Sequence, residues 1–341
     1  MRRFFKTGLS FLFLLLCPFV TLLMLYIHFD PFQVVKKYTT YQFSPVDLNR
    51  DYISTEVFLA NRQKYNYNSF IFGSSRATSF NPDSWAKYLN EYAVPFTFDA
   101  TAETVYGINT KLKFLEKEGT DLDNILILLC RNAYYVTENY NDHLGIKHPK
   151  VSGESTMNFQ YSFFKAYFNL KFLMGYYSYL LLGRESILTH GIIQHKGLSL
   201  DYKTNDITPI SWDNELQMNS KKYYEVRKEI FYNREGEQFE NNQEINETCL
   251  DMLMEIRDIL ERNHSNYKII LSPIYDQIKF PTRDKEILVE IFGDHLFDFT
   301  GKNFITENYT NWYESFHFRP FVADSILNII YKGNNDNKMW R

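Results

Sequence analysis

Cysteine is scarce in this chain, with three residues among 341. Cys17 lies in an apolar N-terminal run, which leaves Cys130 and Cys249 for the rest of the chain. Two cysteines are too few for a disulfide framework, and the sequence leaves open whether they pair. The histidines are scattered without the spacing of metal ligands, so we expect neither a metal site nor a cofactor.

A surplus of positive charge is also lacking, because the formal net charge is −4. Without excess Lys and Arg to neutralise phosphates, nucleic-acid binding has no electrostatic support. Aromatic residues, in contrast, are plentiful at 18%, with 26 Tyr and 30 Phe. This abundance has two explanations: dense core packing, or a surface that stacks on sugar rings or lies against a membrane.

The N-terminal segment has the pattern of a signal anchor. Arg2, Arg3 and Lys6 precede an apolar run from Gly8 to Phe29, about the length that crosses a bilayer. Positive charge before the run places the N-terminus in the cytoplasm and the remainder outside. A cleaved signal peptide would need small residues near its cleavage site, whereas the run ends in LYIHFD. The sequence therefore predicts a single-pass protein of the cytoplasmic membrane with an extracytoplasmic body.

The body alternates short apolar runs with helical patterns. Alternation of this kind predicts βαβ units and a parallel sheet, and runs such as ILILL predict that both faces are covered. We therefore expect an α/β fold with a doubly wound, five-stranded parallel sheet. The five expected strands are residues 69–73, 95–100, 125–129, 267–271 and 295–299.

Residues 151–243 interrupt this alternation. Their first part is dense in Phe, Tyr and Leu and looks helical, and their second part is polar and irregular. We interpret them as an inserted helical cap over the carboxyl ends of the strands. The expected organisation is an anchor at 1–30, a juxtamembrane connector at 31–62, the α/β domain in two parts at 63–150 and 244–333, the cap at 151–243, and a tail at 334–341.

A serine follows the first expected strand, in the run Gly73-Ser74-Ser75-Arg76. Ligands of open parallel sheets bind at the carboxyl ends of the strands, so this turn is a candidate nucleophile site. The backbone N–H of Ser75 at a helix N-terminus would also stabilise developing negative charge. The alternative is that the serine only caps the next helix. The run is also close to the G-x-S-x-G elbow of α/β-hydrolases, so it does not choose between folds.

A second candidate group lies before the last helix, where Glu314 and His317 are three residues apart. On a helical turn this spacing places both side chains on one face. The carboxylate can then orient the imidazole while its other nitrogen accepts a proton from serine. The alternative is a surface histidine beside a surface acid.

Together, the early serine and the late acid-x-x-His resemble the SGNH/GDSL hydrolase family, whose motifs are Gly-Asp-Ser and Asp-x-x-His. The likeness is closest to a membrane-anchored branch that includes the D-alanyl transfer protein and polysaccharide O-acetylation proteins. It covers roughly residues 65–135 and 265–332. The resemblance implies a flavodoxin-like sheet, a catalytic Ser75–His317–Glu314 triad and a polytopic membrane acyltransferase as partner.

The chain departs from the family pattern at several positions. Glu314 stands where the family has Asp, and Ser74 replaces Asp in the first motif. The resemblance assigns Asn132 to an oxyanion hole with the Ser75 N–H, although Cys130 replaces the Gly of that block; a turn Asn is the alternative. No Gly follows the second strand before Gly107, so a second oxyanion donor is not assigned.

Arg76 directly follows the candidate nucleophile, and the sequence leaves its role open. It would bind an anionic part of the substrate, or it would pair with Asp99 or Glu314.

The main functional hypothesis is a serine-dependent esterase or O-acyltransferase that acts on acylated cell-surface glycan, with water or a sugar hydroxyl as acceptor. A second hypothesis is a non-catalytic SGNH-like partner protein in surface polysaccharide assembly. A third is a carbohydrate-binding module that uses exposed aromatic rings.

Overall fold

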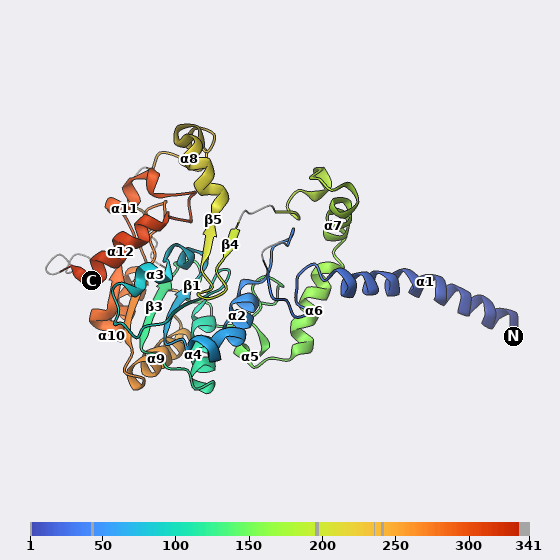
Figure 1. The fold of residues 1–341 in the computed structure, drawn as a ribbon, viewed down its shortest axis with the longest axis horizontal. Helices are drawn as coiled ribbons and strands as arrows, with labels where there is room; N and C mark the ends of the chain where they lie inside the picture. The colour runs from blue at the N-terminus through green and yellow to red at the C-terminus, as the bar shows by residue number, and fades with distance from the viewer. Residues whose placement is uncertain (1, 42–43, 195–197, 235, 240–241, 334–341) are drawn as a thin grey trace. The chain divides into compact units, whose positions relative to one another are not determined.

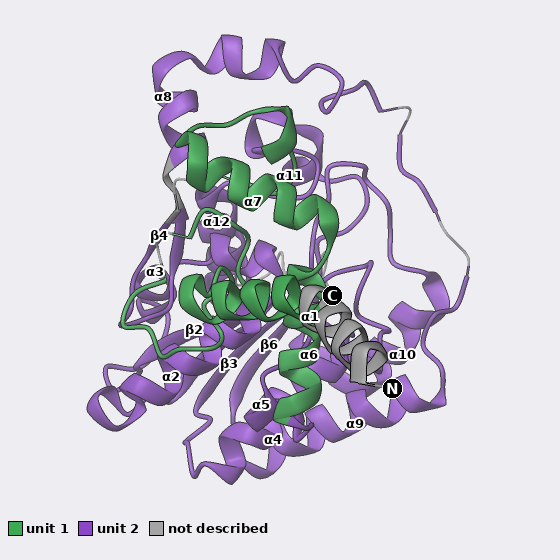
Figure 2. Ribbon diagram, turned by 90° about the vertical axis from the view of Figure 1, so that its right-hand side faces the viewer, with its two compact units in different colours: residues 1–48, 156–195 green, residues 49–155, 196–341 purple. Residues whose placement is uncertain are grey.

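The computed structural model describes residues 2–333 except 42–43, 195–197, 235 and 240–241, and the tail expected at 334–341 lies outside the described residues. The chain divides into two compact units (Figures 1 and 2). One comprises residues 1–48 and 156–195, and the other comprises residues 49–155 and 196–341.

The larger unit is built on a five-stranded sheet whose neighbouring strands are all parallel, in the order β2-β1-β3-β6-β7. In chain order this is the 2-1-3-4-5 arrangement of flavodoxin-like sheets. The predicted five-stranded parallel sheet is confirmed. Its strands are β1 (Ser69–Gly73), β2 (Pro95–Asp99), β3 (Asn124–Leu129), β6 (Asn266–Leu271) and β7 (Leu296–Asp298).

One face of the sheet carries an aromatic core. Phe58 projects from α2 (Arg50–Tyr65) and contacts Phe70, Phe96 and Phe98 of β1 and β2. Phe114 of α4 (Val105–Lys117) packs on the same group, and α9 (Glu247–Arg262) lies against α4. These Phe residues therefore serve core packing, which was the first of the two explanations for the high aromatic content.

The opposite face is covered by the short helix α3 (Pro82–Ala86) and the C-terminal helix α12 (Pro320–Lys332). Trp85 and Ile326 are fully buried there with Ile71 and Leu126 of the central strands. The sheet is thus covered on both faces, which explains why its strands are continuously apolar. A further helix, α10 (Thr282–Phe292), connects β6 to β7 through the 3-10 turn η3 (Gly293–His295).

The smaller unit contains α1 (Arg2–Phe29), α6 (Thr156–Tyr167), α7 (Leu170–Leu182) and η2 (Ile187–Thr189). The predicted transmembrane helix needs correction. The apolar run is helical, but no helix within the described residues is long and apolar enough to cross a membrane. A transmembrane span needs about 20 consecutive apolar residues.

The segment expected to be one cap contributes to both units. Residues 156–195 belong to the smaller unit, whereas the stretch from Leu198 belongs to the larger one. In the larger unit it forms a hairpin, β4 (Leu198–Leu200) with β5 (Ile207–Pro209), and then α8 (Ile210–Glu225). The preceding α5 (Pro149–Ser152) also lies in the larger unit.

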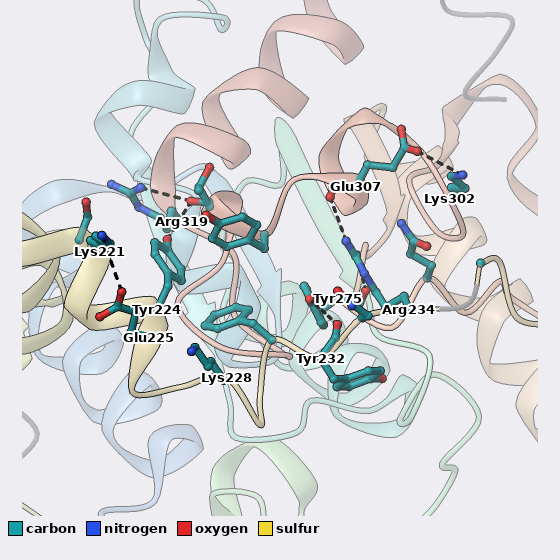
Figure 3. A pocket seen from close by; sticks show the side chains of 17 residues that line it. Lys221, Tyr224, Glu225, Lys228, Tyr232, Arg234, Tyr275, Lys302, Glu307 and Arg319 are labelled. Carbon is teal, nitrogen blue, oxygen red and sulfur yellow. Dashed lines mark hydrogen bonds and ion pairs between the residues drawn. The ribbon is translucent and has the colours of Figure 1, made fainter.

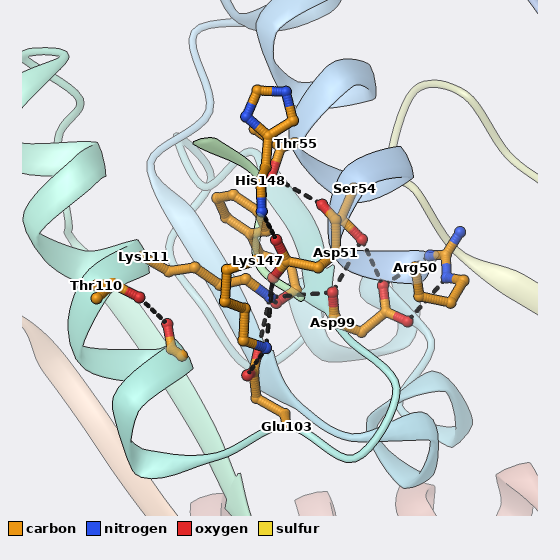
Figure 4. A network of polar contacts seen from close by, with 12 residues as sticks. Arg50, Asp51, Ser54, Thr55, Asp99, Glu103, Thr110, Lys111, Lys147 and His148 are labelled. Atoms are coloured by element: carbon orange, nitrogen blue, oxygen red, sulfur yellow. Dashed lines mark hydrogen bonds and ion pairs between the residues drawn. The ribbon is translucent and has the colours of Figure 1, made fainter. Parts of the chain in front are cut away.

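Four fully buried charged side chains form a balanced network beside the carboxyl end of β2 (Figure 4). Glu103 accepts hydrogen bonds from Lys111 and Lys147, each at 2.5 Å. Lys111 also lies 3.1 Å from a carboxylate oxygen of Asp51. Burial raises the pKa of Asp51, but the two lysines outweigh burial and hold it below its usual range. The network fixes the loop after β2 to α2 and α4.

We expect Glu103→Gln to lower the free energy of unfolding by about 3–5 kcal/mol, because it leaves a buried lysine charge uncompensated. Urea unfolding measures the loss. The control is Glu215→Gln, which removes a half-exposed partner of Arg227 and should cost less than about 1 kcal/mol. Equal losses in the two variants would contradict the role of the network.

A half-buried carboxyl in the hairpin predicts a pH dependence of stability. Burial raises the pKa of Asp206 to about 6, although Asn81 donates a 2.8 Å hydrogen bond to it. The folded protein therefore retains a proton that the unfolded chain releases near pH ~4. Stability contributed by this protonation is present at low pH and declines as pH rises toward about 6. Asp206→Asn should raise the free energy of unfolding by about 1–2 kcal/mol at pH ~7.5 and by much less at pH ~4.5.

Urea unfolding of wild type and Asp206→Asn at both pH values tests this expectation. The exposed Asp251→Asn change in α9 serves as control and should show no such pH-dependent gain. A gain that is the same at both pH values would contradict the assignment.

Candidate active site

The turn that holds Ser75 follows the end of β1. Ser74 caps the 3-10 helix η1 (Ser75–Ser79) and accepts a hydrogen bond from the Arg76 N–H at 3.4 Å. A Cβ on Gly73 would lie 3.0 Å from the Cβ atoms of Ala77 and Leu128, so a larger residue would force these buried neighbours to shift. Capping is thus done by Ser74, which leaves the Ser75 hydroxyl for another partner.

A short loop between η4 (Tyr309–Asn311) and α12 carries Glu314 and His317; it follows α11 (Phe304–Glu307). An isolated bridge between Trp312 and Phe318 closes the loop, and the Tyr313 N–H donates to the His317 carbonyl at 2.9 Å. Trp312 and Phe318 are fully buried. Their burial anchors both ends of the loop and projects its centre toward η1.

Ser75, His317 and Glu314 form one hydrogen-bonded line. The Ser75 Oγ and the His317 Nε2 are 2.7 Å apart. The His317 Nδ1 hydrogen bonds to the Glu314 Oε1 on the far side of the ring. This is the order of contacts that lets an imidazole take the serine proton while a carboxylate fixes its tautomer. All three predicted triad residues are brought together.

The Glu314 carboxylate is fixed by its own loop. Its Oε1 accepts the His317 N–H at 2.7 Å and its Oε2 accepts the Phe316 N–H at 3.1 Å. Burial raises the pKa of Glu314, but the His317 side chain and these N–H groups outweigh burial and lower it below its usual range. The carboxylate therefore stays ionised at neutral pH, ready to stabilise an imidazolium.

The carboxyl end of β3 lies beside the nucleophile turn, as the sheet order requires. The Ser74 Oγ and the Cys130 Sγ are 3.0 Å apart. Asn132 follows in an exposed turn, and no contact in the described part of the chain joins its side chain to Ser75 or His317. The Ser75 N–H begins a 3-10 helix, where backbone donors lack helical acceptors. Cys130 and Cys249 are both buried and unpaired, which answers the disulfide question.

A left-handed backbone conformation marks the loop after β2. Ala102 has φ 48°, which is uncommon for a residue other than Gly, Asn or Asp. Glu103, the next residue, is held by the buried ionic network. No Gly lies between the end of β2 and Gly107, and Ala102 nevertheless adopts a backbone conformation that glycine favours.

Arg76 is 4% exposed and joins the nucleophile turn to the histidine loop. Its Nε donates to the Phe316 carbonyl at 2.9 Å, and its guanidinium lies over the Phe316 ring. The Nη1 is buried without a hydrogen-bond partner in the described residues. Neither alternative ion pair forms, because Asp99 pairs with Arg50 at 2.7 Å and Glu314 with His317.

Helix α8 adds an aromatic side chain to the site that no sequence pattern predicted. The Trp212 ring lies 5.8 Å from the His317 ring and 5.1 Å from Tyr313. The Tyr313 hydroxyl hydrogen bonds to Asp213 of the same helix at 2.5 Å. No motif marks Trp212, because its role depends on α8 packing against a loop about a hundred residues later.

Comparisons with known proteins add no family: no family model and no curated protein matches this chain.

Arg76→Lys should slow any reaction at Ser75 by about 10-fold to 100-fold, because lysine keeps the charge but cannot donate from Nε while lying flat on Phe316. The rate of Ser75 modification by a fluorophosphonate measures this effect. Arg283→Lys, at a side chain that is 65% exposed, is the matched control and should react as wild type does. An unchanged rate in Arg76→Lys would contradict the positioning role.

Proposed function

We propose that this protein is a serine-dependent acyl-transfer enzyme of the SGNH type, an esterase or O-acyltransferase acting on acylated cell-surface glycan. The observation that carries the proposal is the continuous line from the Ser75 Oγ through His317 to Glu314. A supporting feature is the position of the line at the carboxyl end of β1, beside the place where the strand order reverses.

The chemistry has two balanced half-reactions. The Ser75 Oγ attacks the ester carbonyl while its proton passes to the His317 Nε2, and Glu314 stabilises the imidazolium. The tetrahedral intermediate collapses, the C–O bond to the leaving alcohol breaks, and His317 returns the proton to that alcohol. Water or a sugar hydroxyl then attacks the acyl-enzyme and gives its proton to His317. The bond between the acyl carbon and the Ser75 Oγ breaks, and His317 returns the proton to Ser75.

The oxyanion of the intermediate needs donors near the Ser75 backbone. The Ser75 N–H is the donor we assign first, at the start of η1. Asn132 would be the second if its exposed turn moves toward the nucleophile on substrate binding. Catalytic hydrogen bonds are often completed only in the substrate complex.

The non-catalytic alternative has less support. A protein that only binds a partner has no requirement for the Ser75–His317 contact of 2.7 Å or for a carboxylate held by two N–H groups. The glycan substrate, the polytopic acyltransferase partner and the extracytoplasmic location stay predictions of the sequence.

Covalent labelling tests the proposal directly. Wild type exposed to a fluorophosphonate should gain one adduct on Ser75, detected by intact mass and peptide mapping. Ser75→Ala should abolish the adduct, and His317→Ala and Glu314→Gln should slow labelling by about 10³-fold or more, because triad members act as a unit.

The matched control is Ser84→Ala, at a serine of α3 outside the site, which should label at the wild-type rate. Circular dichroism confirms that each variant is folded. A folded wild type that gains no adduct would overturn the proposal.

A further inference from the structure

A pocket lies next to the histidine loop, the segment from Trp312 to Phe318, and none of the three triad residues lines it. It is a pocket of about 1020 Å³ in the larger unit, bordered by α8, the segment that follows it, and residues 302–319 (Figure 3). Thr310 and Arg319 line the pocket, and Glu314 and His317 lie between them in the chain. The same loop therefore forms one wall of the pocket and carries two triad residues.

Positive charge predominates around the pocket. Five cationic and two acidic side chains line it, although the chain as a whole has a net charge of −4. The two acids are already engaged: Glu225 lies 4.0 Å from Lys221, and Glu307 lies 3.3 Å from Lys302. Three cations thus have no carboxylate partner in the described part of the chain: Lys228, Arg234 and Arg319.

The two arginines are fixed without being neutralised. Arg234 donates to the backbone carbonyls of Tyr275 and Glu307, at 2.8 and 2.9 Å, and lies 4.1 Å from the centre of the Tyr275 ring. Arg319 donates to the Thr310 carbonyl at 3.2 Å. Carbonyl oxygens orient a guanidinium but do not neutralise its positive charge, so both arginines are held in place and can attract an anion. Figure 3 shows them on opposite sides of the pocket.

Aromatic rings make up much of the remaining surface. Tyr224 packs edge to face against both Phe231 and Tyr309, and Phe231 packs against Tyr275. Tyr309 is 47% exposed and Tyr232 is 43% exposed, so parts of these rings face solvent. Flat, half-exposed rings offer apolar faces to the C–H surface of a sugar, while their hydroxyls hydrogen bond at the edge.

The pocket lies within reach of the triad along α8. Trp212 contacts His317, whereas Ser220 and Tyr224 of the same helix line the pocket. α8 bends at Asn219, which has non-helical backbone angles, and Trp212 and Ser220 lie on either side of this bend. Eight residues span at most about 29 Å, so an extended saccharide chain of several rings is long enough to occupy both places.

We propose that this pocket is a binding subsite for an anionic saccharide, one that carries carboxylate or phosphate groups on its sugar rings. The cations supply charge recognition and the half-exposed tyrosines supply ring contacts. The further claim, that this saccharide is the polymer modified at Ser75, rests on the proposed function.

Calorimetric titration of the full chain tests the subsite. An oligomer of galacturonic acid should bind at least about tenfold more tightly than a neutral maltodextrin oligomer of equal length, and added salt should weaken its binding. A phosphorylated mannose oligomer serves as the second arm, and the tighter of the two anionic sugars identifies carboxylate or phosphate as the preferred group. Polyglutamate should bind more weakly than the better sugar, because it lacks ring faces.

Lys228→Glu should weaken binding of the anionic sugar by about fivefold or more, since it reverses an unpaired charge at the pocket. The matched control is Lys117→Glu, an exposed charge reversal in the last turn of α4 that does not line the pocket, which should bind as wild type does. Equal affinity for maltodextrin or polyglutamate, or wild-type affinity in Lys228→Glu, would overturn the proposal.

Labelling of Ser75 by the fluorophosphonate in the same samples separates the two proposals. Adduct formation without sugar binding removes the subsite and retains the nucleophile. Sugar binding without an adduct retains the subsite and removes the acyl-transfer function.

Discussion

The hydrogen bond between Ser75 and His317 joins residues that are 242 positions apart, and the site exists only while that contact is held. Two further bonds hold the same two segments together. Arg76 donates to the Phe316 carbonyl at 2.9 Å, and the Ser79 hydroxyl donates to the Phe318 carbonyl at 2.7 Å. Each begins on η1 and ends on the histidine loop. The nucleophile turn and the loop that carries His317 are therefore held together by three hydrogen bonds. Burial of α12 on the sheet keeps the loop in this position.

Burial makes the contact between these two segments rigid, but it also removes the hydration of their polar groups. The Arg76 guanidinium is 4% exposed, and one of its nitrogens has no hydrogen-bond partner among the described residues. It is stable only where its other contacts and its stacking offset the lost hydration. The buried charges at the loop after β2 also lose their hydration, and they offset this loss by pairing two lysines with two carboxylates. Such networks are costly to form and costly to break, so they favour a single geometry at the carboxyl edge of the sheet.

The pocket beside the histidine loop gives the proposed chemistry a route to selectivity. A hydrolase needs only the triad and an oxyanion hole, and water is always available as acceptor. Transfer to a sugar requires that the acceptor be held long enough to compete with water. Arg234 and Arg319, oriented by backbone carbonyls, offer such a hold for a charged polymer. A saccharide bound in the pocket would also contact the loop that positions His317.

The sequence by itself determined the parallel sheet and the kinds of side chain available at the carboxyl ends of its strands. Apolar runs with helical stretches between them specify five buried parallel strands, because each run can be satisfied only inside a two-faced sheet. The spacing of Glu314 and His317 specifies their local pairing, since a short loop contact depends on few residues. The fate of the apolar N-terminal run was predicted less well: it is helical, but a membrane-crossing helix is not found among the described residues.

Only the tertiary structure decided which distant groups meet. Arg76 had three candidate partners in the sequence and contacts a backbone carbonyl instead, because Arg50 and His317 already occupy the two carboxylates. Trp212 carries no motif and reaches His317 through the packing of α8. Asn132 lies in an exposed turn, where side-chain direction depends on surroundings that spacing does not encode. Long-range contacts of this kind depend on the packing of whole elements, so local sequence patterns specify the residues available but not their partners.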